Sequence, residues 1–225
     1  MERGNPNGGI NKIYYVRIMD AEVIDLFPST VLKFKNKDQE VFDELEECVK
    51  AIEQNENLTL HTGVNIPNDQ SWLHFFGNYR LPKLNKFISD GIDTYVGNDE
   101  WQLWSSWLNI YPKGSNQDKH LHAGYDLSAC YYHCTSPEQG LINFHSPLRE
   151  SQLDCYGTYQ QMAVPTESGT LIIFPSWLEH STTPNESDLF KISIGMNIKV
   201  TKSGERPFLG QSYGKHTVIH KYNGI

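Results

Sequence analysis

The chain has little positive charge for its length. Its 225 residues include 19 Lys and Arg against 27 Asp and Glu, so the formal net charge is −8. A protein that binds nucleic acid regardless of base sequence needs a basic surface, and so does one that docks on an anionic membrane. We therefore expect neither a nucleic-acid partner nor a membrane partner.

Long apolar runs and paired cysteines are missing as well. No apolar stretch approaches the roughly 20 residues of a membrane span, and the opening residues MERGNPNGGINK lack the apolar core of a secretory signal. The four cysteines, Cys48, Cys130, Cys134 and Cys155, form no C-x-x-C pair. These features predict a cytoplasmic protein whose thiols are reduced.

The distribution of apolar residues predicts helices first and strands later. Residues 37–54 and 81–96 each place apolar side chains on one helical stripe. After residue 100, short apolar stretches alternate with Gly, Pro, Asn and Ser, which is typical of many short strands. The expected strands are 103–111, 119–123, 127–134, 140–145, 160–164, 170–175, 189–200 and 217–222, preceded by one or two strands within 13–35.

We read residues 1–225 as a single domain, because no linker separates the two halves. Residues 1 to about 100 would supply strands and supporting helices, and residues from about 101 to 225 the β core. The expected class is mainly β (α+β), a sandwich or barrel with two or more N-terminal helices packed outside.

Three histidines are candidates for a metal site. His120 and His122 are two residues apart, so in an extended segment their side chains point to the same face. His180 follows a distant apolar strand and a turn, and its imidazole would complete a set of three ligands. Imidazole binds Fe, Zn, Cu and Ni, so the spacing does not name the metal.

Residues 190–200 alternate between two kinds of side chain. Ile192, Ile194, Met196 and Ile198 share one face of the expected strand, while Lys191, Ser193, Gly195, Asn197 and Lys199 share the other. The polar face either meets water or lines a pocket. In a pocket, the Lys191 ammonium would face an anionic ligand.

A third segment adds a tyrosine to the same set. In residues 128–134, strand alternation places Ser128, Cys130 and Tyr132 on one face and His133 on the opposite face. The phenol of Tyr132 can hydrogen-bond a carboxylate.

Taken together and in this order, the segments resemble a known enzyme family. They are Trp107-Leu108-Asn109, His120-Leu121-His122, Leu127 to Tyr132, Gly140 to Phe144, Gly169 to Pro175, Phe174 to His180, and Pro184-Asn185. The chain is similar from about residue 22 to 200 to Fe(II)/2-oxoglutarate-dependent dioxygenases of the prolyl-hydroxylase-like group, above all to oxygenases of bacteria and their phages.

The resemblance implies a fold and roles for particular residues. The fold is a double-stranded β-helix, a jelly-roll or cupin-like barrel with iron at its mouth. His120, His122 and His180 would hold Fe(II), with no catalytic residue beyond these ligands. Lys191 stands where the family has a basic residue, usually Arg, that grips the far carboxylate of 2-oxoglutarate, and Tyr132 where a tyrosine assists it. Asn109 and Ser193 are further cofactor-binding candidates. Asn109 and the tryptophans Trp104, Trp107 and Trp177 could line the mouth, but ordinary packing in the core is the favoured interpretation for each tryptophan.

The sequence departs from the family at one ligand. His122 occupies a position where the wider superfamily has Asp or Glu, so a site of three histidines carries one negative charge fewer and should bind Fe(II) more weakly. Asp126 is the alternative third ligand. We favour His122, because residues i and i+2 already converge.

The implied reaction is hydroxylation of a substrate C–H bond with release of succinate and CO2, using 2-oxoglutarate and O2. The substrate would be a peptide, a protein or a small molecule, and a homodimer stays open. Two other functions compete. One is a cupin-type metalloprotein without 2-oxoglutarate, which Gly114, His120, His122 and Asp126 partly fit. The other is a catalytically degenerate β-barrel that serves as a binding module.

Overall fold

The computed structural model describes residues 29–53, 75–133, 136–147 and 160–201. Within these ranges the chain forms two antiparallel β-sheets and few helices. The predicted strand at 217–222 lies outside the described residues, as does the part of 13–35 before residue 29. None of the described helices has the length and apolar character needed to cross a membrane.

The larger sheet has five strands in the order β1-β6-β3-β8-β2. They are β1 (Leu32–Lys35), β6 (Thr170–Pro175), β3 (Leu127–His133), β8 (Lys191–Thr201) and β2 (Glu100–Tyr111). The smaller sheet has the order β5-β4-β7, made of β5 (Gln161–Pro165), β4 (Leu141–His145) and β7 (His180–Thr182). The short helix η2 (Pro137–Gln139) precedes β4.

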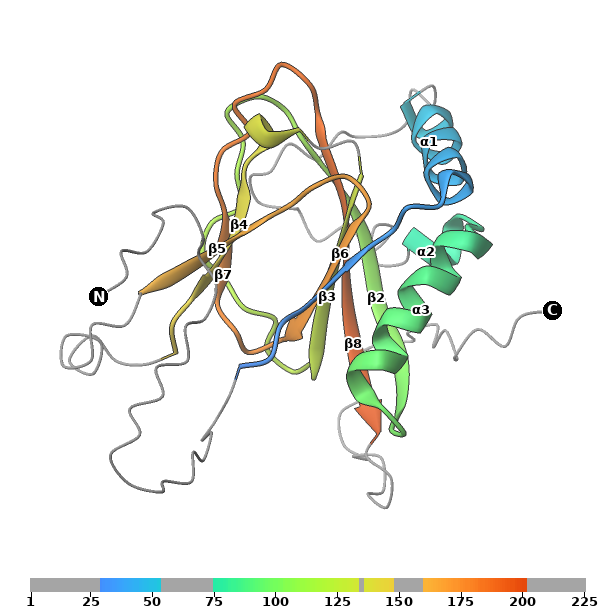
Figure 1. Ribbon diagram of the computed structural model, residues 1–225, viewed down its shortest axis with the longest axis vertical. Helices are drawn as coiled ribbons and strands as arrows, with labels where there is room; N and C mark the ends of the chain where they lie inside the picture. Colours follow the sequence, from blue (N-terminus) through green and yellow to red (C-terminus); the bar gives the residue numbers. More distant parts are fainter. Residues whose placement is uncertain (1–28, 54–74, 134–135, 148–159, 202–225) are drawn as a thin grey trace, which may run out of the picture.

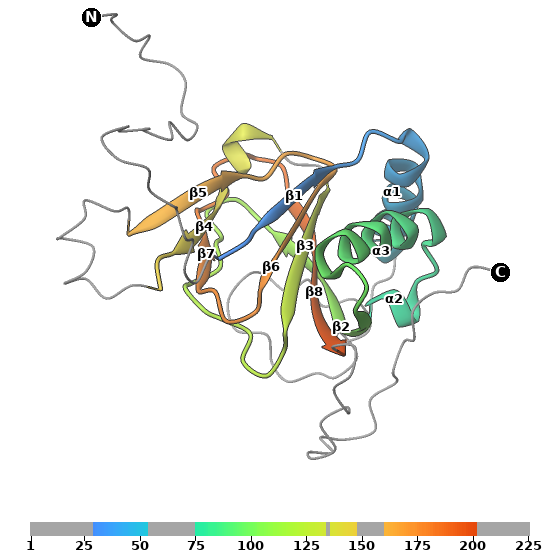
Figure 2. The ribbon, with the colours of Figure 1, turned by 60° about the horizontal axis from the view of Figure 1, so that its bottom comes forward.

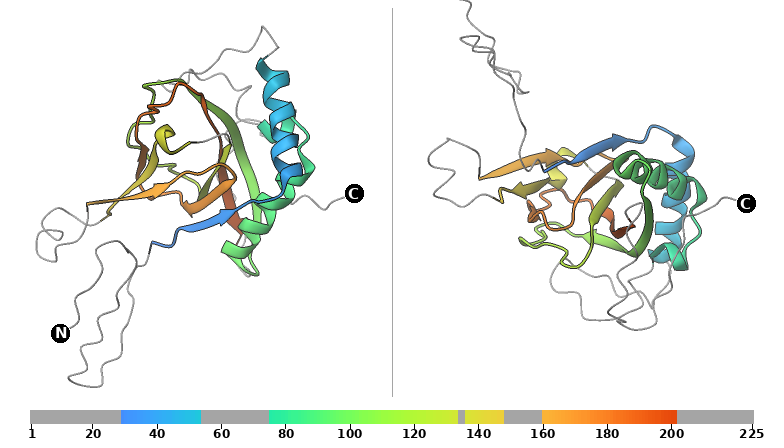
Figure 3. Two further views of the ribbon diagram at one scale, coloured as in Figure 1. Left: turned by 45° about the horizontal axis from the view of Figure 1, so that its top comes forward. Right: turned by 90° about the horizontal axis from the view of Figure 1, so that it is seen from below.

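Three helices form a layer on one side of the larger sheet, and the smaller sheet lies on the other side (Figure 1). They are α1 (Gln39–Glu53), α2 (Phe75–Asn78) and α3 (Pro82–Val96). The same layering is visible after a 60° turn (Figure 2) and in two further orientations (Figure 3). The prediction that N-terminal helices pack outside a β core is confirmed for the described residues.

Two apolar cores follow from strand alternation. Ile194 and Ile198 of β8 and Tyr131 of β3 belong to the core between the larger sheet and the helices. Tyr132 and Ile172, their neighbours on the opposite face, belong to the core between the two sheets. Each strand of the larger sheet thus presents one face to the helices and the other to the smaller sheet.

The helix layer packs closely on the sheet at Gly91 of α3. A Cβ at this position would lie 2.8 Å from Cδ2 of Leu171 on β6. The absence of a side chain therefore sets the distance between α3 and the strand below it.

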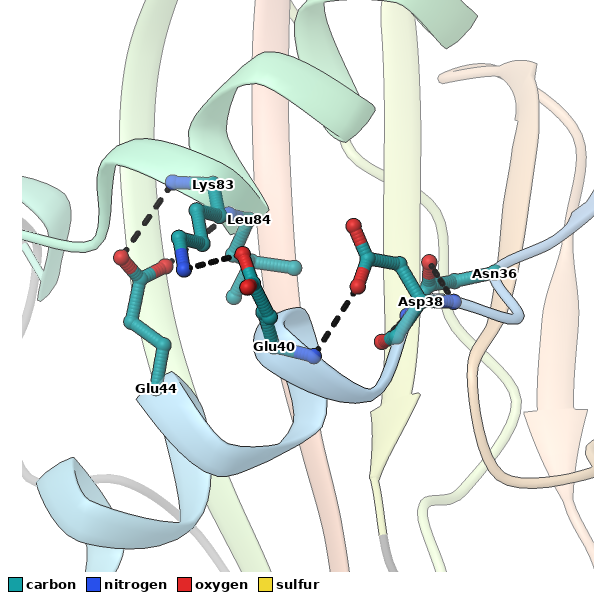
Figure 4. Close-up of polar contacts among 6 residues, drawn as sticks. All are labelled: Asn36, Asp38, Glu40, Glu44, Lys83 and Leu84. Carbon is teal, nitrogen blue, oxygen red and sulfur yellow. Dashed lines mark hydrogen bonds and ion pairs between the residues drawn. The ribbon is translucent and has the colours of Figure 1, made fainter.

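Helix α1 supplies the N-terminal cap that α3 lacks (Figure 4). The residue before α3 is Leu81, whose side chain accepts no hydrogen bond. Instead, Glu44 of α1 accepts hydrogen bonds from the backbone N–H groups of Lys83 (3.2 Å) and Leu84 (3.0 Å). Lys83 also pairs with Glu40 of α1. A carboxylate at a helix N-terminus satisfies free N–H groups and complements the helix dipole.

We expect Glu44→Ala to lower the free energy of unfolding by about 1 kcal/mol, the usual cost of losing a helix cap. Glu44→Gln keeps an acceptor and should cost less. Urea denaturation followed by circular dichroism measures both changes. The exposed Glu47 of the same helix serves as the control, because Glu47→Ala should leave stability nearly unchanged. Equal losses for the Glu44 and Glu47 variants would contradict the capping role.

The predicted elements differ from the structure in a few places. Residues 119–123 form no regular strand; His120 makes an isolated bridge to His180, and the His122 N–H donates to the Ser176 carbonyl at 2.9 Å. The segment is held in place by these backbone contacts. Strand β7 and helix α2 were not predicted, because three or four residues are too few for a periodic pattern.

Candidate metal and cosubstrate pocket

A pocket of about 200 Å³ opens between the two sheets. It is small beside the roughly 300–1,000 Å³ of pockets for drug-sized ligands, and therefore suits a compact ligand. Its walls come from the inward face of the larger sheet, from the segment that carries His120 and His122, and from β4 and β7. The lining residues used below are Trp107, Asn109, His120, His122, Cys130, Tyr132, His180, Lys191, Ser193 and Gly195.

The imidazoles of His120, His122 and His180 converge at this pocket. One ring nitrogen of each lies within 4.8 Å of the others, close enough for a single metal ion. The bridge between His120 and His180, with backbone hydrogen bonds of 3.0 and 2.9 Å, brings the two distant segments together. The donor set of three imidazoles fits a transition metal such as iron, nickel or zinc.

The environment keeps two of these rings neutral. Burial, followed by the nearby His120, lowers the pKa of His122 from 6.5 to about 4. The same causes lower the pKa of His180 to about 3. Because a metal binds the deprotonated imidazole, neither ring needs to lose a proton at neutral pH before it can act as a ligand.

Backbone carbonyls orient two of the rings. Nδ1 of His120 lies 2.7 Å from the Asp118 carbonyl, and Nδ1 of His180 lies 3.0 Å from the Leu178 carbonyl. Since a carbonyl only accepts, each Nδ1 carries a proton, and in a neutral imidazole Nε2 is then the nitrogen with the free lone pair. Metal-binding histidines typically have this kind of support.

The alternative ligand Asp126 does not reach the cluster. Its side chain is exposed, and Oδ2 accepts a hydrogen bond of 2.8 Å from the Val200 N–H. Among the described residues, the group of side chains close enough to share a metal consists of the three histidines. Asp126 instead fastens the end of β8, a role that its position four residues after His122 did not reveal.

Lys191 contributes a buried cation to the pocket. Its side chain is 2% exposed, and Nζ has no hydrogen-bond partner within the described ranges. Nζ lies 5.4 Å from the ring centre of Tyr132, a contact between a cation and an aromatic face. Burial lowers the pKa of Lys191 from 10.5 to about 8, so the group is charged at pH 7 and fits an anionic ligand.

The other three expected cosubstrate residues also line the pocket. Tyr132 is buried, and burial raises the pKa of its phenol well above the usual value, so it stays protonated and can donate. Asn109 Nδ2 donates to Ser193 Oγ at 3.3 Å, linking β2 to β8. The face of β8 thus lines a pocket at Lys191 and Ser193, and both side chains are buried.

The sequence did not predict some of the residues that line the pocket, and it gave others no role. Tyr111 also lines the pocket. It is two residues after Asn109 on the same strand, so strand alternation could have predicted that both side chains share a face. Gln117 lies in an irregular segment and carried no signal. Cys130, already expected on the face of Tyr132, is a free thiol whose pKa is raised by burial, an effect that hydrogen bonds with Tyr132 and Ser193 partly offset. Trp104 is not among the pocket residues, whereas Trp107 is.

Sheets and pocket together define a β-sheet protein with a three-histidine metal-binding geometry. Residues 105–197, which include every residue lining the pocket, match the family model described as "Putative 2OG-Fe(II) oxygenase". Over this region, which is less than half of the chain, the sequence is similar to 2-oxoglutarate- and Fe(II)-dependent oxygenases, enzymes that use Fe(II) and 2-oxoglutarate. The comparison with curated protein sequences yields no match.

Solved structures of similar fold include enzymes of this kind. The non-heme, alpha-ketoglutarate-dependent carbocyclase SnoK from nogalamycin biosynthesis has a TM-score of 0.56 and 15% identity, covering 76% of this chain and 79% of its own. EctD from S. alaskensis, in its apoform, has a TM-score of 0.55 and 17% identity, covering 76% and 73%. EctD with 2-oxoglutarate and 5-hydroxyectoine has a TM-score of 0.53 and 16% identity, covering 76% and 72%. At these identities the similarity is one of fold.

A buried ammonium without a partner costs stability. We expect Lys191→Met to raise the free energy of unfolding of the ligand-free protein at pH 7 by about 2–3 kcal/mol, since one pKa unit corresponds to about 1.4 kcal/mol. The folded-state pKa is lowered, so the penalty is complete below pH 8 and disappears as the pH rises from 8 towards 10.5. The advantage of the variant should therefore shrink over that window.

Urea denaturation at pH 7, 8, 9 and 10 measures this difference. The control is Lys86→Met, which removes an exposed lysine of α3 and should show no comparable gain. A destabilised Lys191→Met variant at pH 7 would contradict the assignment of an unpartnered ammonium.

Proposed function

We propose that the chain hydroxylates a substrate C–H bond with Fe(II) held by His120, His122 and His180 and with 2-oxoglutarate held by Lys191 and Tyr132. One observation carries the proposal: a buried, unpartnered ammonium shares a small pocket with three converging imidazoles. A dicarboxylate that places one end at the histidines and the other at Lys191 would satisfy both features.

The protein groups divide the work at this site. Iron, when bound, supplies oxidation by O2 coupled to decarboxylation of 2-oxoglutarate, with release of succinate and CO2. Lys191 neutralises the far carboxylate, and Tyr132 donates a hydrogen bond to it. Asn109 and Ser193, hydrogen-bonded to each other, line the same wall and orient the cosubstrate. A lysine supplies charge but not the two-pronged hydrogen bonding of an arginine.

We infer that the two sheets are the halves of a double-stranded β-helix, a jelly-roll barrel within one domain. The strand orders β1-β6-β3-β8-β2 and β5-β4-β7 support this inference, as does the similarity of fold to SnoK and EctD. The helices share an apolar core with the larger sheet, which supports a single folding unit. A cytoplasmic location and a homodimer stay predictions.

The substrate class is inferred less directly. Leu121 lies between His120 and His122, and Trp177 lies three residues before His180. Their side chains are 42% and 50% exposed, which adds apolar surface next to the histidines in sequence. SnoK is a carbocyclase of nogalamycin biosynthesis, and EctD was solved with 5-hydroxyectoine. These relatives support a small-molecule substrate, and a peptide or protein side chain is the second candidate.

Anaerobic titration of Fe(II)-loaded protein with 2-oxoglutarate tests the proposal. We expect a saturable visible charge-transfer band at one equivalent. Lys191→Met should retain iron but bind 2-oxoglutarate about 10–100-fold more weakly, because a hydrogen bond to a charged group contributes about 1.5–3 kcal/mol. His180→Ala should lose stoichiometric iron while circular dichroism shows an intact fold.

Each other outcome favours a different function. Iron uptake without the band would favour the cupin-type metalloprotein. Absence of stoichiometric iron in the unaltered protein would favour the non-catalytic binding module. Unchanged affinity of Lys191→Met for 2-oxoglutarate would remove Lys191 from the site.

The affinity for 2-oxoglutarate should depend on pH through Lys191. The pKa of the free group is about 8, and a bound carboxylate raises it, so binding favours the protonated form. Affinity is therefore highest below pH 8 and should fall by up to about tenfold per pH unit above it. Calorimetric titrations between pH 7 and 9.5 measure the fall. Lys191→Met is the control and should show a much flatter profile; equally steep profiles would contradict the role of Lys191.

A further inference from the structure

The three histidines of the pocket are not supported in the same way. His120 and His180 each have Nδ1 fixed by a backbone carbonyl. Among the described residues, no hydrogen bond reaches the ring of His122; only its backbone N–H is bound, to the Ser176 carbonyl. The main chain of His122 is therefore anchored, while rotation of its side chain is not restricted by any such bond.

Aromatic stacking takes the place of the missing hydrogen bond. The Trp107 indole stacks on the His122 ring, with centroids 5.6 Å apart and an angle of 25° between the planes. His122 also stacks with the His180 ring, with centroids 5.2 Å apart and an angle of 12° between the planes. The His122 ring thus stacks with two rings, those of Trp107 and His180. Aromatic contacts of this kind each stabilise the structure by about 0.5–1.5 kcal/mol beyond the effect of the apolar area that they bury.

Gly195 makes room for the indole on the inward face of β8. A Cβ at this position would lie 2.5 Å from Cε2 of Trp107, 2.6 Å from Cζ2 and 2.7 Å from Nε1. Trp107 and Gly195 are register partners on β2 and β8. Any side chain at position 195 would therefore push the indole away from its present place. The glycine has an ordinary backbone conformation, so close approach is what requires it.

We propose that Trp107 is the positioning residue of His122: seated over Gly195, the indole holds the plane of the imidazole in the orientation that a metal ion needs. This inference rests on the proposed metal site. It explains why a tryptophan and a glycine face each other across β2 and β8 at the pocket. It also assigns Trp107 a role that acts through His122 and not through contact with the metal.

Anaerobic titration with Co(II), followed by its visible absorption, tests the inference. Trp107→Ala should weaken Co(II) binding about tenfold, the lower end of the effect of losing support for a metal ligand. Trp107→Phe keeps an aromatic ring and should restore binding to within about threefold of the unaltered protein. Gly195→Ala should weaken binding as Trp107→Ala does, because its methyl group displaces the indole.

Double variants separate positioning from a general loss of structure. In a His122→Ala background, Trp107→Ala should change Co(II) affinity by less than about twofold, since no ring is left to position. In a Trp107→Ala background, Gly195→Ala should likewise have little effect. Trp101→Phe is the matched control on β2: this buried tryptophan bonds Asp93 on the helix side, and its loss should leave Co(II) affinity unchanged.

The outcomes distinguish this inference from the proposed function. If His122→Ala weakens Co(II) binding but Trp107→Ala and Gly195→Ala do not, the positioning role is overturned and the metal site stands. If the unaltered protein binds no Co(II), both fail. If Trp107→Ala is as damaging without His122 as with it, Trp107 acts on the fold in general and the inference is overturned. Should Trp107→Ala not fold, Gly195→Ala and Trp107→Phe carry the same comparison.

Discussion

The two-faced character of β8 is the constraint on which the rest of the structure depends. Lys191, Ser193 and Gly195 line the pocket, and the even-numbered residues from 192 to 198 belong to the apolar core shared with the helices. A strand can do both because successive side chains point to opposite sides. The apolar face holds the sheet and helix layer together, which allows the opposite face to bury Lys191 and polar side chains beside the pocket.

That arrangement is costly for the empty protein. Lys191 is a buried ammonium without a hydrogen-bond partner in the described structure. Burial also lowers the pKa of His122 and His180, which favours the neutral form of both rings. Neither feature contributes to the stability of the fold. Both features suit the ligands of the proposed function, the ammonium a carboxylate and the imidazoles a metal ion.

The cluster of three histidines differs in charge from the usual ligand set of the family that the sequence resembles. Three imidazoles supply no negative charge to a cation, and the carboxylate expected as the alternative ligand, Asp126, accepts a hydrogen bond from the backbone of β8 instead. Affinity for a metal must then depend more on how well the rings are oriented. Backbone carbonyls orient the rings of His120 and His180 through hydrogen bonds. For His122, the proposed orienting contact is the stacking with Trp107.

Much of the fold and the site was predictable from residue order. Helices α1 and α3 begin and end within two residues of their expected bounds, because each has an apolar stripe of helical period. Alternation grouped Tyr132 with Cys130 and Lys191 with Ser193 on shared faces, and the spacing of two residues placed His120 and His122 together. The convergence of His180 with them was expected from the resemblance to the family.

Other features are decided only by the tertiary structure. The bridge between His120 and His180, the support of each ring, and the place of Asp126 depend on segments up to 74 residues apart meeting in one register. Capping of α3 by Glu44 depends on two helices meeting at one end. The sequence by itself determined which side chains share a face, since that follows from local geometry; which faces meet, and which buried groups find a partner, is set by packing between distant segments.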